Sequence, residues 1–318
     1  MAVPARGSHR GGVAVTGAAG FVGSAVVRRE LARGQRVMAL IRACEQEQME
    51  AGIPSLVVEW SDARQLRAAL AAAAPRAIIH CAGAGSRSAE APAALYEANA
   101  GLAAKLLDGV AGVCPQVPVV LLSSAAVYGP RARVPVCESA SLNPVTHYGF
   151  SKALTEQIAR AYSSLDSLHL VIARPFNVVG PREPRGSVVH SLLTQLASAP
   201  EAETVRVALR ETASVRDFVD VSDVADALVL LADEGEPGGL YNVCTGVGTT
   251  VGDMARVAAD VTGRRLQADV LEPDDPGTVS VGSPARLMAL GWSTRYSLGD
   301  SLLRAYDALL ESDTGVGR

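Results

Sequence analysis

The feature that most constrains the fold of this chain is an apolar segment followed at once by three evenly spaced glycines. Val13 to Gly23 reads VAVTGAAGFVG, and a run compatible with a helix continues to Leu31, with Gly34 placed to end it. In the order strand, glycines, helix, the free backbone amides of the helix start can face a phosphate. The segment therefore predicts a dinucleotide-binding turn at the start of an α/β domain.

Each glycine of this segment has its own physical task. Gly17 permits a tight turn, Gly20 keeps a Cβ away from a pyrophosphate, and Gly23 lets the helix pack closely on the strand. Phe21 and Val22 lie between the glycines and are expected to line the same ligand. The G-x-x-G-x-x-G spacing is a weak signal by itself, so the interpretation depends on residues farther along the chain.

The first half of the chain alternates apolar runs with helical stretches. Strands are predicted at 13–16, 37–41, 56–58, 77–80 and 117–122. Helical segments between strands require crossover connections, so we predict a parallel, doubly wound α/β sheet of the Rossmann type. Its ligands would bind beyond the carboxyl ends of the strands.

The second half of the chain has shorter predicted elements and a higher density of proline and glycine. We therefore predict a dinucleotide-binding Rossmann domain at residues 1–178, rejoined by about 217–245, and a smaller C-terminal α/β substrate-binding lobe at 179–318. Within the rejoining stretch, Asp223 is expected to cap a helix at 224–232.

Composition narrows the classes of partner. The 318 residues carry a net charge of -4 and 4% aromatic residues, so no nucleic-acid surface is expected. The five cysteines form no C-x-x-C pair, which indicates reduced thiols in a cytoplasmic protein and disfavours a zinc site. No apolar stretch reaches the length that spans a bilayer. We therefore expect no metal, no nucleic acid and no membrane partner.

The residue after the second predicted strand bears on cofactor choice. An acidic residue there would accept hydrogen bonds from the adenosine ribose of NAD. Here Arg42 follows Ile41, and a guanidinium can pair with a 2′-phosphate. We therefore predict NADP(H) as the cofactor, the alternative being that Arg42 is an ordinary solvated loop residue.

The expected chemistry follows the fifth predicted strand. Ser123 to Gly129 reads SSAAVYG, and Tyr148 and Lys152 lie four residues apart, on one face of a predicted helix. A phenol has a reference pKa of about 10, and a neighbouring ammonium would lower that pKa toward the neutral range. Ser124 is placed to hydrogen-bond a carbonyl or alkoxide oxygen. Tyr128, the rival phenol, is expected to pack beneath the site.

Taken together, these motifs resemble the extended short-chain dehydrogenase/reductase family, the branch of nucleotide-sugar epimerases, dehydratases and reductases. The similarity covers nearly the whole chain. The matching pieces, in order, are TGAAGFVG (16–23), Asp62, HCAG (80–83), Asn99, SSAAVYG (123–129), YGFSK (148–152), ARPFNVVGP (173–181), RDFVDVSDVADA (216–227), YNVCTG (241–246) and LGWSTRYSL (290–298).

The resemblance implies a role for each of these pieces. The catalytic triad would be Ser124, Tyr148 and Lys152. Cofactor contacts would come from Gly17, Gly20, Phe21, Val22, Gly23, Arg42, Asp62, Ala63, Cys81, Ala82, Gly83, Asn99, Tyr148, Lys152 and Pro175. Substrate contacts would come from Ser86, Ser124, Asn177, Arg182 and Arg216.

The activity that the resemblance implies is reduction of a sugar ketone. The 4,6-dehydratases of the family usually carry an Asp-Glu pair where this chain has Ala125 and Ala126, and methyl groups cannot move protons. The second half is most similar to GDP-4-keto-6-deoxy-mannose reductases and related NDP-sugar 4-ketoreductases of deoxysugar and antibiotic pathways. The expected reaction is NADPH-dependent reduction of a 4-keto-6-deoxy NDP-sugar, with Tyr148 as proton donor.

Other activities and assemblies stay open. Residues 271–276 are acidic where the family often carries an arginine for the substrate diphosphate, so a natural-product ketone such as a polyketide is one alternative substrate. An NDP-sugar 4-epimerase is a second alternative. A non-catalytic binder is disfavoured because Tyr148 and Lys152 are both present. By the resemblance, a homodimer is a further expectation.

Overall fold

The residues described in this computed structural model are 11–86, 91–130, 134–200, 203–209, 212–270 and 277–314. Within them, the largest sheet has seven strands, all parallel, in the order β10-β6-β5-β4-β1-β2-β3. Its strands are β1 (Val13–Thr16), β2 (Val37–Ile41), β3 (Ser55–Val57), β4 (Ala77–His80), β5 (Val119–Leu122), β6 (Leu170–Pro175) and β10 (Leu240–Val243). The predicted doubly wound parallel sheet is confirmed.

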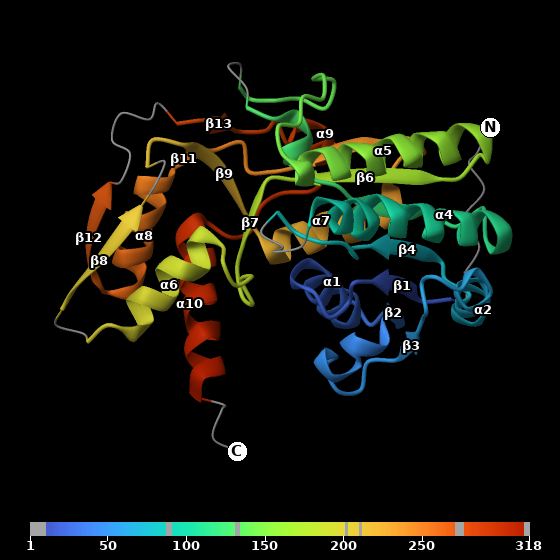
Figure 1. Ribbon diagram of the computed structural model, residues 1–318, viewed down its shortest axis with the longest axis horizontal. Helices are drawn as coiled ribbons and strands as arrows, with labels where there is room; N and C mark the ends of the chain where they lie inside the picture. The colour runs from blue at the N-terminus through green and yellow to red at the C-terminus, as the bar shows by residue number, and fades with distance from the viewer. Residues whose placement is uncertain are drawn as a thin grey trace.

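Alternate residues of the central strands face two separate apolar cores, as the two-residue period of a strand requires. Val15 packs into the core on one face and Ala14 into the core on the other. One face is covered by α1 (Phe21–Ala32) and α7 (Val221–Glu234), the other by α2 (Ala63–Ala73), α4 (Leu102–Val113) and α5 (His147–Leu165). Figure 1 shows α4 and α5 side by side over the sheet.

The strand order fixes where a ligand can enter. The chain leaves β1 for α1 on one face of the sheet and leaves β4 for the helices on the other face, although β1 and β4 are neighbours. A crevice therefore opens between the two connections, beyond the carboxyl ends of the strands. Gly17, Cys81 and Ser123 follow β1, β4 and β5 directly, so all three lie at this edge.

A smaller region of mixed sheet lies to one side of the large sheet (Figure 1). Here β9 pairs in parallel with β7 and β13 and antiparallel with β11, while β8 and β12 form a separate parallel pair. The elements are β7 (Asn177–Val179), α6 (Val188–Ser198), β8 (Thr204–Leu209), β9 (Val215–Asp220), β11 (Gly248–Thr250), α8 (Val251–Thr262), β12 (Arg265–Val270), β13 (Val279–Ser280) and α10 (Leu298–Thr314). Helices α6, α8 and α10 enclose its apolar core.

The stretch 217–245 differs in part from the expectation. Its strand β10 is the edge strand of the large sheet, and its helix α7 covers one face of that sheet. Strand β9, however, belongs to the smaller sheet. Helix α7 begins at Val221 and is capped by Asp220, whose carboxylate accepts from the Ser222 amide at 2.7 Å. The predicted cap Asp223 is instead buried inside the helix and accepts from the amides of Arg295 and Tyr296.

Several one-turn elements complete the described part of the chain. They are η1 (Ala43–Gln48), α3 (Pro92–Tyr96), the π turn η2 (Glu97–Gly101), η3 (Ala125–Tyr128) and α9 (Ala285–Met288). Among the described residues, no helix combines the length and apolar character that crossing a membrane would take. The turns η1, η2 and η3 each lie at the edge of the crevice.

Candidate active site

A cavity of about 980 Å³ occupies the crevice and extends to the smaller sheet. This volume is at the upper end of the range for small-molecule sites, roughly 300–1,000 Å³. The predicted site residues that line it are Gly17, Gly20, Phe21, Val22, Gly23, Arg42, Cys81, Ala82, Gly83, Ser86, Ser124, Tyr148, Lys152, Pro175, Asn177 and Arg216. The predicted residues Asp62, Ala63, Asn99 and Arg182 do not line it.

The backbone of the glycine turn fits the close approach of a dinucleotide. Gly17 has φ +64°, and a Cβ there would lie 2.6 Å from the Ala82 amide nitrogen. A Cβ on Gly23 would lie 2.0 Å from the Gly17 carbonyl oxygen. Helix α1 starts after Gly20 without a side-chain cap, which leaves its first amides directed at the cavity for a pyrophosphate.

Ser124, Tyr148 and Lys152 come together on one wall of this cavity. Lys152 Nζ donates to the Leu122 carbonyl at 3.0 Å, and Tyr148 shares a hydrogen bond with Ser124. A Cβ on Gly149 would lie only 2.7 Å from the Ala126 carbonyl oxygen, so the absence of that atom lets α5 approach η3. The i, i+4 spacing on α5 therefore brings the phenol to Ser124 and the ammonium to the Leu122 carbonyl, on the wall of the same cavity.

The pKa of Tyr148 is raised from its ordinary value, and the expectation that the ammonium would lower it is wrong for this structure. Burial is the larger effect because it disfavours the charged phenolate, while the hydrogen bond with Ser124 acts the other way. Burial also lowers the pKa of Lys152 to about 8, against the smaller opposing effects of Cys81 and Glu156. The phenol therefore carries its proton near neutral pH, as a proton donor must.

Asn99 supports the site from behind rather than lining it. It lies in the π turn η2, where its Nδ2 donates to Ser151 Oγ at 2.9 Å. Ser151 Oγ in turn donates to the Tyr148 carbonyl at 2.8 Å. A π turn inside a helix often marks a functional position, and here it turns Asn99 toward the helix that carries the tyrosine.

A buried polar network includes Ser123, the neighbour of Ser124. Arg174 makes two hydrogen bonds to the Glu156 carboxylate, at 2.8 and 2.5 Å, and Ser123 Oγ donates to the same carboxylate at 2.6 Å. Tyr128 accepts from Arg174 at 2.8 Å and donates to Asn242 at 2.7 Å. Tyr128 therefore packs beneath the site, as predicted, and burial raises its pKa.

At the adenosine end of the cavity, the guanidinium of Arg42 pairs with the carboxylate of Glu45. Glu45 also lines the cavity, with Gln48 and Trp60, and none of these three was predicted. Only the i, i+3 spacing from Arg42 points to Glu45 in the sequence, and that spacing has meaning only if the residues form a turn. The predicted contact Asp62 caps α2 by accepting from the amides of Arg64 and Gln65; Ala63 is the first residue of that helix.

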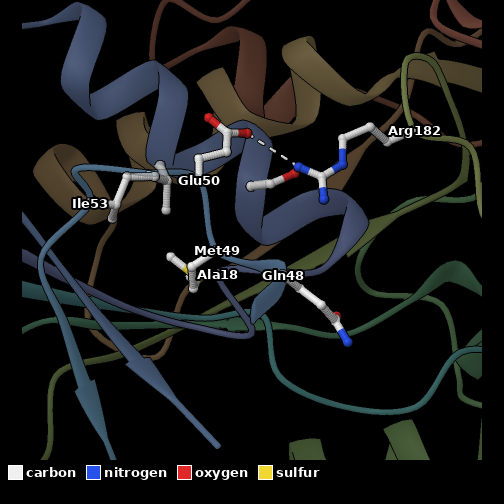
Figure 2. A pocket seen from close by; sticks show the side chains of 8 residues that line it. Ala18, Gln48, Met49, Glu50, Ile53 and Arg182 are labelled. Carbon is white, nitrogen blue, oxygen red and sulfur yellow. Dashed lines mark hydrogen bonds and ion pairs between the residues drawn. The ribbon is translucent and has the colours of Figure 1, made fainter. Parts of the chain in front are cut away.

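Arg182 lies on the outer side of the glycine turn (Figure 2). Its guanidinium pairs with Glu50 at 3.2 Å and donates to the Ala19 carbonyl at 3.4 Å. It does not lie with the other predicted substrate residues, because these contacts hold it against Glu50 and the glycine turn. In the same loop after β7, Arg185 lines the cavity instead.

The far end of the cavity is formed by the smaller sheet. Arg216 on β9 lines it and donates to the Thr278 carbonyl at 2.7 Å. Asn177 on β7 lines it as well and donates to the Asp217 carbonyl at 3.1 Å. The acidic stretch 271–276 lies outside the described residues.

Burial shifts the pKa values of two titratable groups at the carboxyl end of β4, His80 and Cys81. His80 is buried, lies 2.7 Å from Thr16 Oγ1, and has its pKa lowered to about 3, first by burial and then by Lys152. Burial raises the pKa of Cys81 to about 12. No group of three or more His, Cys, Asp or Glu able to hold a metal ion occurs in the part of the chain that the structure describes.

Comparisons with known proteins agree with this geometry. A UDP-glucose 4-epimerase of Azospirillum brasilense is 29% identical, with 95% of this chain and 94% of the relative covered. A dTDP-6-deoxy-L-talose 4-dehydrogenase (NAD(P)(+)) of Kitasatospora kifunensis is 28% identical, with 93% and 95% covered. A GDP-6-deoxy-D-mannose reductase of Pseudomonas aeruginosa is 29% identical, with 57% and 62% covered. These identities do not single out the reductases.

The fold is shared with solved structures. The crystal structure of UDP-glucose 4-epimerase from Thermus thermophilus in complex with NAD matches with a TM-score of 0.81 at 29% identity, covering 94% of this chain and 98% of that one. Residues 13–244 match the family described as NAD dependent epimerase/dehydratase. That range contains the glycine turn, the triad and Arg216, so the chain belongs to the NAD dependent epimerase/dehydratase family.

Proposed function

We propose that this protein is an NAD(P)H-dependent ketoreductase that reduces the C4 ketone of a nucleoside-diphosphate-linked deoxysugar, with NADPH as the expected reductant. The observation that carries the proposal is that Ser124, Tyr148 and Lys152 line the same cavity as the glycine turn. A cofactor and a ketone held in one cavity react without the entropic cost of a bimolecular encounter.

Each residue of the triad has a distinct task in this proposal. Bound nicotinamide cofactor supplies the hydride that reduces the carbonyl carbon. The Tyr148 hydroxyl donates its proton to the developing alkoxide, and its raised pKa keeps that proton available. Ser124 hydrogen-bonds the same oxygen and fixes its position. The Lys152 ammonium, held by the Leu122 carbonyl, contributes positive charge beside the oxygen.

Two alanines argue for reduction over dehydration. Ala125 and Ala126 line the cavity directly after the serine and bring no acid or base to it. Loss of water from a sugar needs a proton carrier at each of the two carbons involved. Reduction needs only the one donor that Tyr148 provides.

Two cations on the cavity wall support a phosphate-bearing substrate. Arg185 and Arg216 both line the cavity, and guanidinium groups pair with phosphate oxygens in a bidentate manner. The relatives named above act on sugars linked to UDP, dTDP or GDP. We therefore propose an NDP-sugar as the substrate class.

A second candidate is an NDP-sugar 4-epimerase. The observation that favours it is the Glu45 carboxylate at the adenosine end, because a carboxylate there accepts from the ribose of NAD and a 4-epimerase recycles a tightly held cofactor. The protein should then turn over its sugar without consuming added cofactor.

The decisive experiment follows NAD(P)H absorbance with purified protein and a panel of dTDP- and GDP-linked 4-keto-6-deoxysugars, with aromatic polyketide ketones as a separate arm. Stoichiometric cofactor consumption with a nucleotide sugar, abolished in Tyr148→Phe, supports the proposal. Interconversion of 4-epimers without net consumption identifies the epimerase. Turnover of polyketide ketones alone contradicts the proposed substrate class.

A further inference from the structure

Glu45 holds Arg42 by three hydrogen bonds rather than one. Its Oε1 accepts from Arg42 Nη2 at 2.8 Å and from Arg42 Nε at 3.2 Å, while its Oε2 accepts from the Arg42 backbone amide at 2.8 Å. The two residues share the same cavity wall, next to Gln48 and Trp60. A carboxylate and a guanidinium therefore lie together at the position after β2 where the sequence shows an arginine.

The local structure keeps the carboxylate in place whatever the guanidinium does. Arg42 is the N-cap of the 3₁₀ turn η1, and Glu45 is its third residue, so the bond from Oε2 to the Arg42 amide is the backbone half of a capping box. The Glu45 side chain is 16% exposed, whereas that of Arg42 is 57% exposed. When the arginine turns toward a ligand, the carboxylate therefore stays at the cavity wall.

A fixed carboxylate acts differently on the two nicotinamide cofactors. The 2′-phosphate of NADPH carries roughly two negative charges, so Glu45 repels it and competes with it for Arg42. The 2′-hydroxyl of NADH can instead donate to the carboxylate, which is the interaction typical of NAD sites. Glu45 therefore weakens the preference for NADPH that Arg42 alone would give.

We propose that Glu45 determines cofactor selectivity in this protein, by holding Arg42 and by presenting its own carboxylate, so that the site accepts NADH as well as NADPH. The inference rests on the proposed function only in requiring that the cavity bind a nicotinamide dinucleotide. It does not depend on which ketone is reduced.

The test measures equilibrium binding of NADPH and of NADH by their fluorescence, without substrate. Wild-type protein is expected to bind both. In Glu45→Gln, which keeps an acceptor for the Arg42 amide, the Kd for NADPH should fall about three- to tenfold, whereas that for NADH should rise about two- to threefold because the 2′-hydroxyl loses a charged acceptor. Glu47→Gln is the matched control, because Glu47 is exposed on the same turn and does not line the cavity.

A double-mutant cycle isolates the role of Arg42. In an Arg42→Met background, the gain in NADPH affinity from Glu45→Gln should shrink, because part of that gain comes from releasing the guanidinium. Unchanged NADPH binding in Glu45→Gln, or an equal gain in Glu47→Gln, overturns the inference while leaving the proposed reductase intact. Wild-type protein that binds neither cofactor overturns the proposed function itself.

Discussion

Asn99 holds Ala84 through both ends of its side-chain amide. Its Oδ1 accepts from the Ala84 amide at 3.1 Å, and its Nδ2 donates to the Ala84 carbonyl at 3.2 Å. Ala84 belongs to the loop after β4 that lines the cavity, and Asn99 is 1% exposed. The same Nδ2 reaches Ser151 on α5, so one side chain fixes the spacing between the cofactor loop and the tyrosine helix.

Asn99→Asp is therefore expected to weaken cofactor binding without a change at the cavity surface. A carboxylate keeps the acceptor for the Ala84 amide but faces the Ala84 carbonyl with a second acceptor, and a buried polar group left unpaired costs about 1–3 kcal/mol. The Kd for NAD(P)H should rise about tenfold or more. Asn143→Asp, at an exposed position, is the matched control. Equal binding by both variants would mean that the loop holds its shape without Asn99.

The pH dependence of reduction should reflect the loss of the Lys152 charge. Because burial lowers the pKa of this lysine to about 8, its ammonium is present below that pH and is lost above it. Tyr148 has a raised pKa and keeps its proton across the same range. The value of kcat/KM, which reports groups of the free enzyme, should thus fall as pH rises through about 8. A profile that climbs between about pH 7 and 9 would assign the essential ionisation to another group.

Removal of one partner from the buried ion pair of Glu156 and Arg174 should strongly destabilise the protein. Both side chains are buried, and the pair joins α5 to β6. Glu156→Gln leaves an uncompensated buried guanidinium, which costs about 3–5 kcal/mol in the free energy of unfolding. Urea denaturation should detect this, and Asp108→Asn, which breaks the exposed pair with Arg67, should cost less than about 1 kcal/mol.

Glu156→Gln should also change the pH dependence of kcat/KM, which a purely structural role of Glu156 would leave unchanged. Glu156 raises the pKa of Lys152, so its neutralisation should shift the falling limb of the kcat/KM profile to lower pH. Similar losses in the free energy of unfolding in Glu156→Gln and Asp108→Asn would show that breaking the buried pair costs no more than breaking the exposed one.

Local patterns in the sequence were sufficient to predict a doubly wound parallel sheet and to place Tyr148 and Lys152 on one helix. The predicted strand at 37–41 matches β2 at both ends, and the i, i+4 spacing of Tyr148 and Lys152 survives because both lie near the start of one helix. The glycine turn could be predicted because the backbone there leaves no room for Cβ atoms, and glycine is the one residue type that lacks a Cβ. The limits of that strand, the i, i+4 pair and the glycine turn each depend on residues fewer than a dozen positions apart.

The residues that were missed or misplaced depend on contacts between distant segments or on burial. Asn99 bonds to a loop 15 residues away, and Asp223 accepts from amides 72 and 73 residues away, so neither role is visible as spacing. The raised pKa of Tyr148 follows from how deeply the folded chain buries the phenol, which periodicity does not reveal. The family resemblance implied a substrate contact for Arg182, and its ion pair with Glu50, 132 residues away, is likewise invisible as spacing.

Arg182 should therefore affect the cofactor rather than the sugar. It has a left-handed backbone conformation, φ 68°, which costs energy for a residue with a Cβ and persists where other contacts hold it. Those contacts run to Glu50 and to the carbonyl of Ala19, a residue of the glycine turn that lines the cavity. Loss of the guanidinium should loosen the outer side of that turn.

Arg182→Gln and Arg185→Gln form a matched pair that separates the two assignments. Arg182→Gln should raise the KM for NADPH about two- to fivefold, as expected for a partly exposed pair, and leave the KM for the sugar nearly unchanged. Arg185→Gln removes a cation from the cavity wall, so it should raise the KM for a diphosphate-linked substrate instead. If Arg182→Gln raised only the KM for the sugar, the role that the sequence implied for this arginine would be restored, because the ion pair with Glu50 would then be incidental to cofactor binding.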